Sequence, residues 1–183
     1  QVWGDITPSQ NANWQNVALN CASAGMTKMI KTILVATDGS DHAKKAVSLA
    51  NDLAKTQKAR LVFVHAALRD ATPEDLRKVA TRGGLTKDQL YQLDHYESDM
   101  KKALSRAGDG AIGTILAPVD LQDAVGTQIL ERAKASAAKA GIKNVSTVLF
   151  RGDPADGILE TAKREKADMI VIGTRGLGDF KSL

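Results

Sequence analysis

The sequence MIVIGTRGLG, residues 169–178, decides the fold class of this chain. Its four apolar residues run directly into a loop that is rich in glycine. A short apolar run of this kind is typical of a parallel strand that helices bury on both faces. Glycines after such a strand expose backbone N–H groups at the carboxyl edge of the sheet, where open α/β folds bind phosphate-bearing ligands. We therefore expect a buried strand over residues 169–172 and a ligand site just after it.

Three similar apolar runs precede this strand, over residues 32–36, 61–64 and 145–150. Patterns typical of helices separate the runs. After the first run small apolar residues recur at a spacing of 3.6, and the stretch 120–140 has an apolar face of the same periodicity. This alternation predicts an α/β fold, with an open parallel sheet sandwiched by helices and connected by right-handed crossovers.

Polar residues indicate where the helices begin. Ser40 and Asp153 each stand at the N-cap position of a predicted helix. Residues 67–118 interrupt the alternation and predict a helical insertion, in which Thr72 and Thr86 begin two helices. The second of these helices has an apolar stripe, which we expect to pack against the main domain or a partner subunit rather than to form a ligand lid. The stripe consists of Leu90, Leu93, Met100 and Leu104.

Residues 1–25 differ in composition from the rest of the chain. They hold both tryptophans and the single cysteine but no Lys or Arg. They show no helix or strand periodicity, and they lack the basic and apolar regions of a signal peptide. We expect this segment to be a tail of upstream or added sequence, with Met26 as the natural first residue, and a functional extension is the alternative. The domain is predicted over residues 26–183.

Composition and charge narrow the classes of function. The net charge of +4 is modest, and Lys and Arg are interspersed with Asp and Glu, so nucleic acid is not an expected partner. No apolar run approaches the roughly 20 residues that a membrane helix needs. The single cysteine cannot form an internal disulfide, and no Cys/His cluster predicts a metal site. These features predict a cytoplasmic protein with one domain, no nucleic-acid partner and no membrane contact.

The sequence predicts no catalytic residue. His42, His65 and His95 lie at a helix start, a strand end and the middle of a helix, without an evident acidic partner. We interpret them as structural or solvated side chains. The phosphate loop G-x4-G-K-[ST] is absent, and so is the dinucleotide motif G-x-G-x-x-G after the first strand.

Four motifs together resemble the universal stress protein (UspA-like) family. They are ILVATDGS at 33–40, VHA at 64–66, RGDP at 151–154 and VIGTRG at 171–176. Each lies at the end of one predicted strand, in chain order. The resemblance extends over residues 31–183 and is looser in the helical insertion.

The resemblance implies a Rossmann-like, adenine nucleotide alpha hydrolase-like fold with the strand order 3-2-1-4-5. The fifth strand would lie beyond Leu183, so we expect the domain to be incomplete at its C-terminus. Family members that bind ATP carry the motif G-x2-G-x9-G-[ST] after the fourth strand, and Gly173 and Gly176 match its first two glycines. The resemblance also implies ATP as the ligand, with or without Mg2+, and a homodimer of the full-length protein.

The nucleotide is expected between the ends of the first and fourth strands, the switch point where an open α/β sheet binds ligands. By resemblance, Asp38 would contact the adenosine end or, through water, the metal ion. The backbone of Ala66 would lie near the adenine, and the small Ala36 and Ala66 would leave room for a flat ring. An Asx turn is the alternative for Asp38, and Arg175 has a phosphate contact and a surface role as open alternatives. The predicted nucleotide-binding set is Ala36, Thr37, Asp38, Ala66, Gly173, Arg175 and Gly176.

These features predict an ATP-binding universal stress protein with a regulatory or protective role in the stress response and at most slow ATP hydrolysis. A UspA-like dimerising interaction protein that binds no nucleotide is the alternative. An enzyme that transfers or hydrolyses phosphate groups is a third hypothesis.

Overall fold

A four-stranded sheet forms the centre of the computed structural model, which describes residues 29–67, 71–81, 85–106 and 115–173. The strands lie in the order β3-β2-β1-β4, and every neighbouring pair is parallel. The predicted parallel α/β class and the strand order 3-2-1-4 are therefore confirmed. The strands are β1 (Thr32–Ala36), β2 (Arg60–Ala67), β3 (Val145–Arg151) and β4 (Met169–Ile172).

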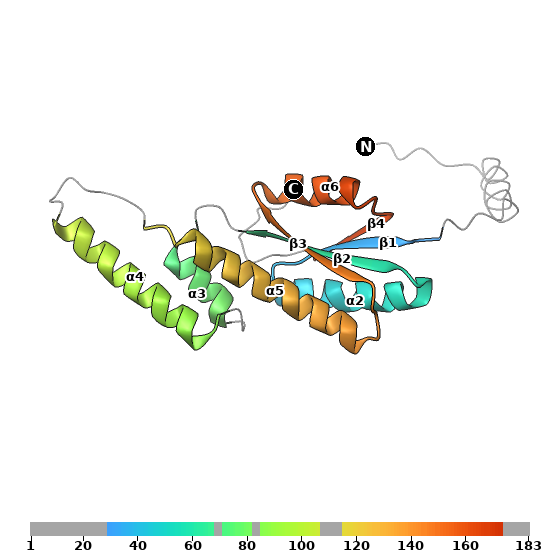
Figure 1. Ribbon diagram of the computed structural model, residues 1–183, viewed down its shortest axis with the longest axis horizontal. Helices are drawn as coiled ribbons and strands as arrows, with labels where there is room; N and C mark the ends of the chain where they lie inside the picture. The colour runs from blue at the N-terminus through green and yellow to red at the C-terminus, as the bar shows by residue number, and fades with distance from the viewer. Residues whose placement is uncertain (1–28, 68–70, 82–84, 107–114, 174–183) are drawn as a thin grey trace, which may run out of the picture.

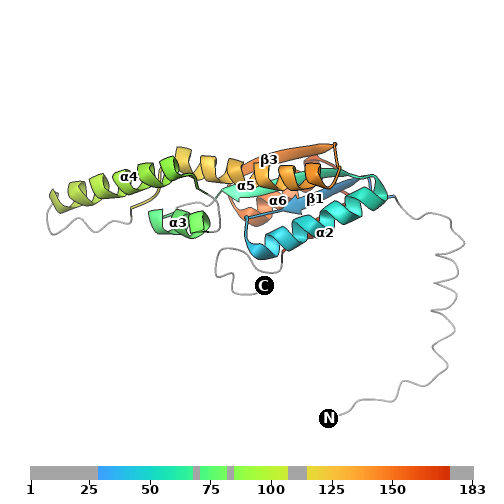
Figure 2. The ribbon, with the colours of Figure 1, turned by 90° about the horizontal axis from the view of Figure 1, so that it is seen from below.

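Helices cover the sheet on both faces (Figure 1). On one face lie α2 (Asp41–Gln57) and α5 (Val119–Lys139), which the view from below also shows (Figure 2), and α6 (Pro154–Arg164) lies on the other. Right-handed crossover connections explain why α2 and α5 lie on one face of the sheet and α6 on the other. The chain moves from β1 to β2 to β3 in one direction and then reverses to reach β4. The reversal makes β1 and β4 neighbours at a topological switch point.

Side chains of β1 and β2 alternate between two hydrophobic cores. Ile33, Val35 and Phe63 are buried against α2 and α5. Leu34 and Val62 are buried against α6. Because both faces of these strands are covered, their sequences read as almost continuous apolar runs.

For β4, the prediction of a strand buried on both faces is wrong. Val171 is buried in the core beneath α2, but Ile170 and Ile172 are 40% and 60% exposed. These two side chains point to the face that carries α6, and α6 packs over β1, β2 and β3. Within the described ranges no element covers β4 on that face. The apolar run correctly indicated the strand but not how much of it a helix would cover.

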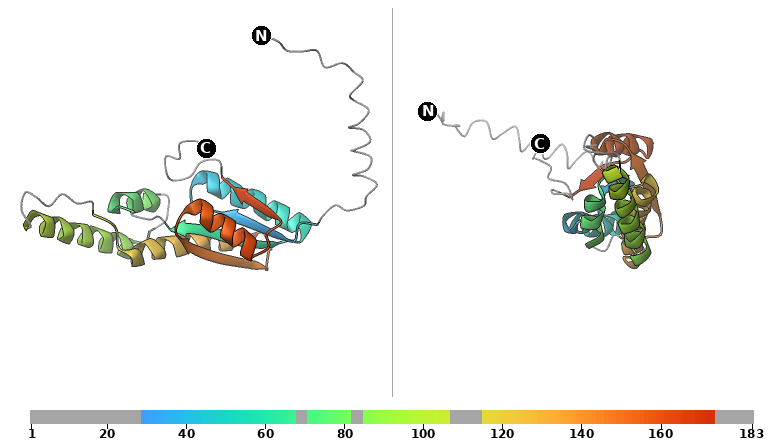
Figure 3. Two further views of the ribbon diagram at one scale, coloured as in Figure 1. Left: turned by 90° about the horizontal axis from the view of Figure 1, so that it is seen from above. Right: turned by 90° about the vertical axis from the view of Figure 1, so that its left-hand side faces the viewer.

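Two further helices, α3 (Pro73–Thr81) and α4 (Lys87–Arg106), lie beyond the carboxyl edge of the sheet (Figures 1 and 3). Both lie within residues 67–118, where the sequence predicted two helices. Leu76 of α3, Leu93 of α4 and Leu121 of α5 belong to one buried cluster. Leu93 is the fully buried member of the predicted α4 stripe, so the first half of that stripe packs on the domain.

The helices begin at the predicted polar residues. Ser40 Oγ accepts a hydrogen bond from the Ala43 amide (3.1 Å) at the start of α2. Asp153 Oδ1 accepts bonds from two amides of the first turn of α6 (2.8 and 3.1 Å). Thr72 and Thr86 accept the corresponding bonds at α3 and α4, so each cap satisfies a donor that the first turn leaves unpaired. In the part of the chain that the structure describes, no helix has the length and apolar character needed to cross a membrane.

Asp168 aligns the starts of β1 and β4. Its Oδ2 accepts hydrogen bonds from the amides of Lys31 (2.9 Å) and Thr32 (3.1 Å). The residues joined in this way are 137 and 136 positions apart in the sequence. The two strands are therefore held in register from their first residues.

Candidate functional site

The predicted site residues that the structure describes gather at the carboxyl edge of the sheet. Ala36 ends β1 and pairs with Ile172, the last residue of β4. Thr37 follows Ala36 and Gly173 follows Ile172, so two loops leave from adjacent strand ends. Ala66 lies near the end of β2, on the other side of β1. The fold thus brings together residues that are far apart in the sequence.

A tight turn joins β1 to α2. Asp38 Oδ1 accepts a hydrogen bond from the Ser40 amide (2.9 Å), which confirms the Asx turn at this position. Gly39 has a φ of +77°, a left-handed conformation that favours glycine. A Cβ atom at Gly39 would lie 3.2 Å from Cγ1 of Ile129 in α5. The turn therefore holds the half-buried Asp38 carboxylate at the sheet edge, directly before the first turn of α2.

Gly173 lies against the first turn of α2. A Cβ atom at Gly173 would lie 3.0 Å from the carbonyl carbon of His42 and 3.1 Å from the amide nitrogen of Ala43. Both neighbours are backbone atoms of a helix, so they cannot rotate away as the end of a side chain could. The first turn of a helix carries N–H donors and the positive end of the helix dipole, and it favours anions. Glycine at position 173 therefore lets the end of β4 come close to the positive end of α2.

A buried histidine joins the end of β1 to β2. His65 is 6% exposed, and its Nδ1 lies 2.8 Å from the carbonyl oxygen of Thr37. Because a carbonyl oxygen only accepts hydrogen bonds, Nδ1 carries the proton and donates it. Burial lowers the pKa of His65, while the bond to Thr37 and the charge of Asp38 oppose this shift. The ring is therefore neutral at pH 7.

The pKa of His65 predicts a loss of stability in mild acid. Because its pKa in the folded state lies below the value of about 6.5 in an unfolded chain, the unfolded chain binds more protons between these two values. The free energy of unfolding should therefore fall as the pH drops below about 6.5, and this group should have no effect well above that pH. Urea denaturation of the wild type and of His65→Asn, from about pH 8 to about pH 5, measures the difference. Asparagine keeps an N–H near the position of Nδ1 but does not titrate, so an identical pH dependence in both proteins would contradict the prediction.

Two side chains beside the candidate site were missed by the sequence analysis. Ile172 pairs with Ala36 and is 60% exposed, and the half-buried Phe150 pairs with Ala66. Strand alternation places both on the face that carries α6, on either side of the two alanines. Counting this alternation back from the predicted strand ends would have placed both side chains beside the site. They are apolar neighbours of the two alanines across the sheet.

Other predicted features have no counterpart in the described residues. Arg175 and Gly176 lie outside them, so their contacts with a phosphate group stay predictions. Where the structure describes side chains, no group of three or more His, Cys, Asp or Glu converges on a position suited to a metal ion. The Asp38 carboxylate is the acidic group of the predicted set.

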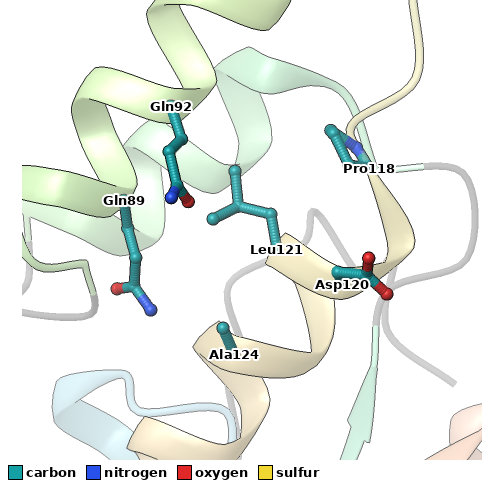
Figure 4. Close-up of a pocket in the computed structure, with 6 residues that line it drawn as sticks. All are labelled: Gln89, Gln92, Pro118, Asp120, Leu121 and Ala124. Atoms are coloured by element: carbon teal, nitrogen blue, oxygen red, sulfur yellow. The ribbon is translucent and has the colours of Figure 1, made fainter.

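A groove between α4 and α5 is separate from this edge (Figure 4). It has a volume of about 280 Å³ and is lined by two carboxamides, one carboxylate and three apolar side chains. These belong to Gln89, Gln92, Asp120, Pro118, Leu121 and Ala124, none of which is a predicted nucleotide contact. The groove is therefore not part of the candidate site.

Comparison with known proteins agrees with the motifs and the strand order. The model of the universal stress protein family matches residues 29–183. A universal stress protein of Thermus aquaticus is 35% identical over 156 residues, which cover 85% of this chain and 85% of that protein. Universal stress protein YxiE of Bacillus subtilis is 32% identical over 155 residues, which cover 85% and 86%. The solved structure of universal stress protein UspA from Lactobacillus plantarum shares the fold, with a TM-score of 0.54, 19% identity and coverage of 86% of each chain. This chain is a member of the universal stress protein family.

Proposed function

We propose that this protein binds an adenine nucleotide, in the first place ATP, at the edge between β1 and β4. One observation carries the proposal: the Asp38 turn, Gly173 and the first turn of α2 converge where the direction of the sheet connections reverses. Open α/β sheets bind ligands at such a switch point. The binding serves a regulatory or protective role in the stress response, in the cytoplasm, with at most slow hydrolysis of ATP.

The chemistry of the edge suits the parts of a nucleotide. The first turn of α2 and the glycine at position 173 favour a phosphate group, because they present backbone N–H groups and a positive dipole end. The Asp38 carboxylate can accept hydrogen bonds from ribose hydroxyls. Ala36 and Ala66 leave room for a flat base, and Ile172 and Phe150 supply apolar surface on either side.

The residues at the edge suit Mg2+ that arrives with the nucleotide. Mg2+ keeps several waters and is commonly held by one or two carboxylates together with the phosphates of the substrate. Asp38 would hold it through water, and no cluster of three acidic, His or Cys ligands stands in the described residues to bind the ion alone. The ion would partly neutralise the phosphate charge, and the chain would position the nucleotide around it.

Calorimetry tests the proposal on the whole chain. Titration with Mg-ATP should give saturable binding in the micromolar range. Titration with AMP separates the contribution of the adenosine end from that of the outer phosphates, and Mg-GTP is the control for recognition of the base. The absence of saturable binding by both ATP and AMP would contradict the proposal.

Two substitutions at Asp38 separate its turn from its contact with the ligand. Asp38→Asn keeps an oxygen for the Ser40 amide and so keeps the Asx turn, but it removes the negative charge. Its affinity for ATP should fall by about tenfold to a hundredfold, since a hydrogen bond to a charged group contributes about 1.5–3 kcal/mol. Asp38→Ala removes the turn as well, and it should weaken binding at least as much. Wild-type affinity in Asp38→Asn would limit Asp38 to its structural role.

A second candidate function is dimerisation without a nucleotide. The exposed Ile170 and Ile172 favour it, because apolar side chains on an edge strand are a typical surface for pairing with another chain. A homodimer is compatible with both candidates. A stable dimer in sedimentation equilibrium, together with no nucleotide binding in calorimetry, would favour the second candidate over the first.

A further inference from the structure

We propose that His65 is a positioning residue of the nucleotide site, which holds the carbonyl of Thr37 and leaves the backbone of Ala66 for the ligand. The inference rests on the proposed function and adds a residue to it. His65 is not expected to touch the nucleotide. It acts through the backbone of Thr37, at the end of β1, and the backbone of Ala66, near the end of β2.

The first step concerns the path of β1 as it leaves the sheet. The Thr37 amide donates to the carbonyl of Val64 (3.0 Å), which is the last ladder bond between β1 and β2. The Thr37 carbonyl is bound by Nδ1 of His65 (2.8 Å). Both polar backbone groups of Thr37 are therefore fixed to β2. Asp38 follows Thr37 directly, so the position of its turn depends on this anchor.

The second step concerns the backbone of Ala66. In a parallel strand the N–H and C=O of one residue point to the same side, and successive residues alternate. The Arg60 amide donates to Lys31, on the β1 side. Ala66 lies an even number of residues after Arg60, so its N–H and C=O also point toward the β1 side. They lie beyond Ala36, the last residue of β1 that pairs with β2. In a continued ladder the Ala66 amide would donate to Thr37, but the imidazole of His65 binds that carbonyl.

The third step concerns what holds the ring in place. His65 points toward α5, where Gly126 provides the space for it. A Cβ atom at Gly126 would lie 2.9 Å from Cδ2 of His65 and 2.6 Å from Cδ1 of Leu149. The ring is therefore enclosed between α5 and the end of β3. Movement of the ring would require movement of α5, so the position of the Thr37 carbonyl is set by the packed core.

Titration of His65 supplies a readout of this role. The charged group that faces the ring is the Asp38 carboxylate, whereas Gly126 of α5 and Leu149 of β3 contribute no charge. A proton on Nε2 would place a charge in this enclosed site, and solvating that charge would require the ring and α5 to move apart. In mild acid the bond from His65 to the Thr37 carbonyl should then weaken, and the affinity for a nucleotide should fall with it.

The test compares the whole wild-type chain with His65→Asn and His65→Leu by calorimetry with Mg-ATP at about pH 7.5, where the imidazole is neutral. Asparagine keeps a donor near the position of Nδ1, so it should bind ATP with an affinity close to that of the wild type. Leucine fills the space without a donor, so the Thr37 carbonyl loses its anchor and the Asp38 turn can shift, and this variant should bind at least about tenfold more weakly. Equal affinity of both variants and the wild type would overturn this inference and leave the proposed function intact. A wild-type protein that binds no adenine nucleotide would overturn both.

A pH series covers the case in which His65→Leu does not fold. The affinities of the wild type and of His65→Asn are compared from about pH 8 to about pH 5.5. Protonation of the nucleotide affects both proteins alike, so it cancels in the ratio of their affinities. The wild type should lose affinity relative to His65→Asn as the pH falls, and a constant ratio over this range would overturn the inference.

Discussion

Gly173→Val is expected to lower the affinity for ATP by at least about tenfold and the free energy of unfolding by about 1–3 kcal/mol. Any Cβ at this position lies 3.0–3.2 Å from backbone atoms of His42 and Ala43, and valine adds two methyl groups to it. Because the helix backbone cannot rotate away, the end of β4 must move from α2. Position 173 would then lose its approach to the positive end of the helix.

Urea denaturation and calorimetry with Mg-ATP measure the two effects. Gly173→Ala is the graded variant, and it should show a smaller change of the same sign in both quantities. Ile170→Val, on the same strand but outside the site, is the matched control, and it should leave the affinity for ATP unchanged. Wild-type affinity and stability in Gly173→Val would show that the contact between β4 and α2 is not needed.

Gly157→Ala should destabilise the protein, although alanine is the better helix former. In an unobstructed helix this change stabilises by about 1 kcal/mol. In α6 the added Cβ would lie 2.6 Å from Cγ and 2.8 Å from Cε1 of Phe150, so the ring must leave its place. Overpacking of this kind costs about 1–3 kcal/mol, which is larger than the gain in helix propensity.

A double-mutant cycle tests whether the contact with Phe150 is what makes Gly157→Ala destabilising. In a Phe150→Ala background the ring is gone, and Gly157→Ala should become neutral or stabilising. Urea denaturation of the four proteins gives the coupling between the two sites. If Gly157→Ala destabilises both backgrounds equally, the conflict with Phe150 is not its cause.

Local signals in the sequence predicted the parts of the fold that depend on neighbouring residues. The limits of β1 and β4, Thr32–Ala36 and Met169–Ile172, coincide with the predicted apolar runs. The N-caps at Ser40 and Asp153 were predicted because a cap needs only the residue and the turn that follows it. The second strand is longer than predicted. Arg60 and His65 interrupt its apolar pattern, although Arg60 pairs with Thr32 and His65 pairs with Leu149.

The parts of the site that depend on distant residues could not be predicted. The Asx turn of Asp38 is local, and it stood among the alternatives read from the sequence. The contact of Gly173 with His42 joins segments that meet only in the fold. The bond from His65 to Thr37 is of the same kind. The exposure of Ile172 depends on where α6 lies, which the composition of β4 does not encode.

The bonds of Asp168 also bear on when the protein can fold. β1 can pair with β2 as soon as both have been synthesised. Asp168, however, lies 137 and 136 positions after Lys31 and Thr32, the residues whose amides it binds. Contacts over such separations form slowly, because a long loop must close before they are made. In a nascent chain the Asp38 turn, which needs only neighbouring residues, can therefore form before Gly173 reaches α2. We therefore expect the proposed nucleotide site at this edge to be completed in a late step of folding, when β4 docks on β1.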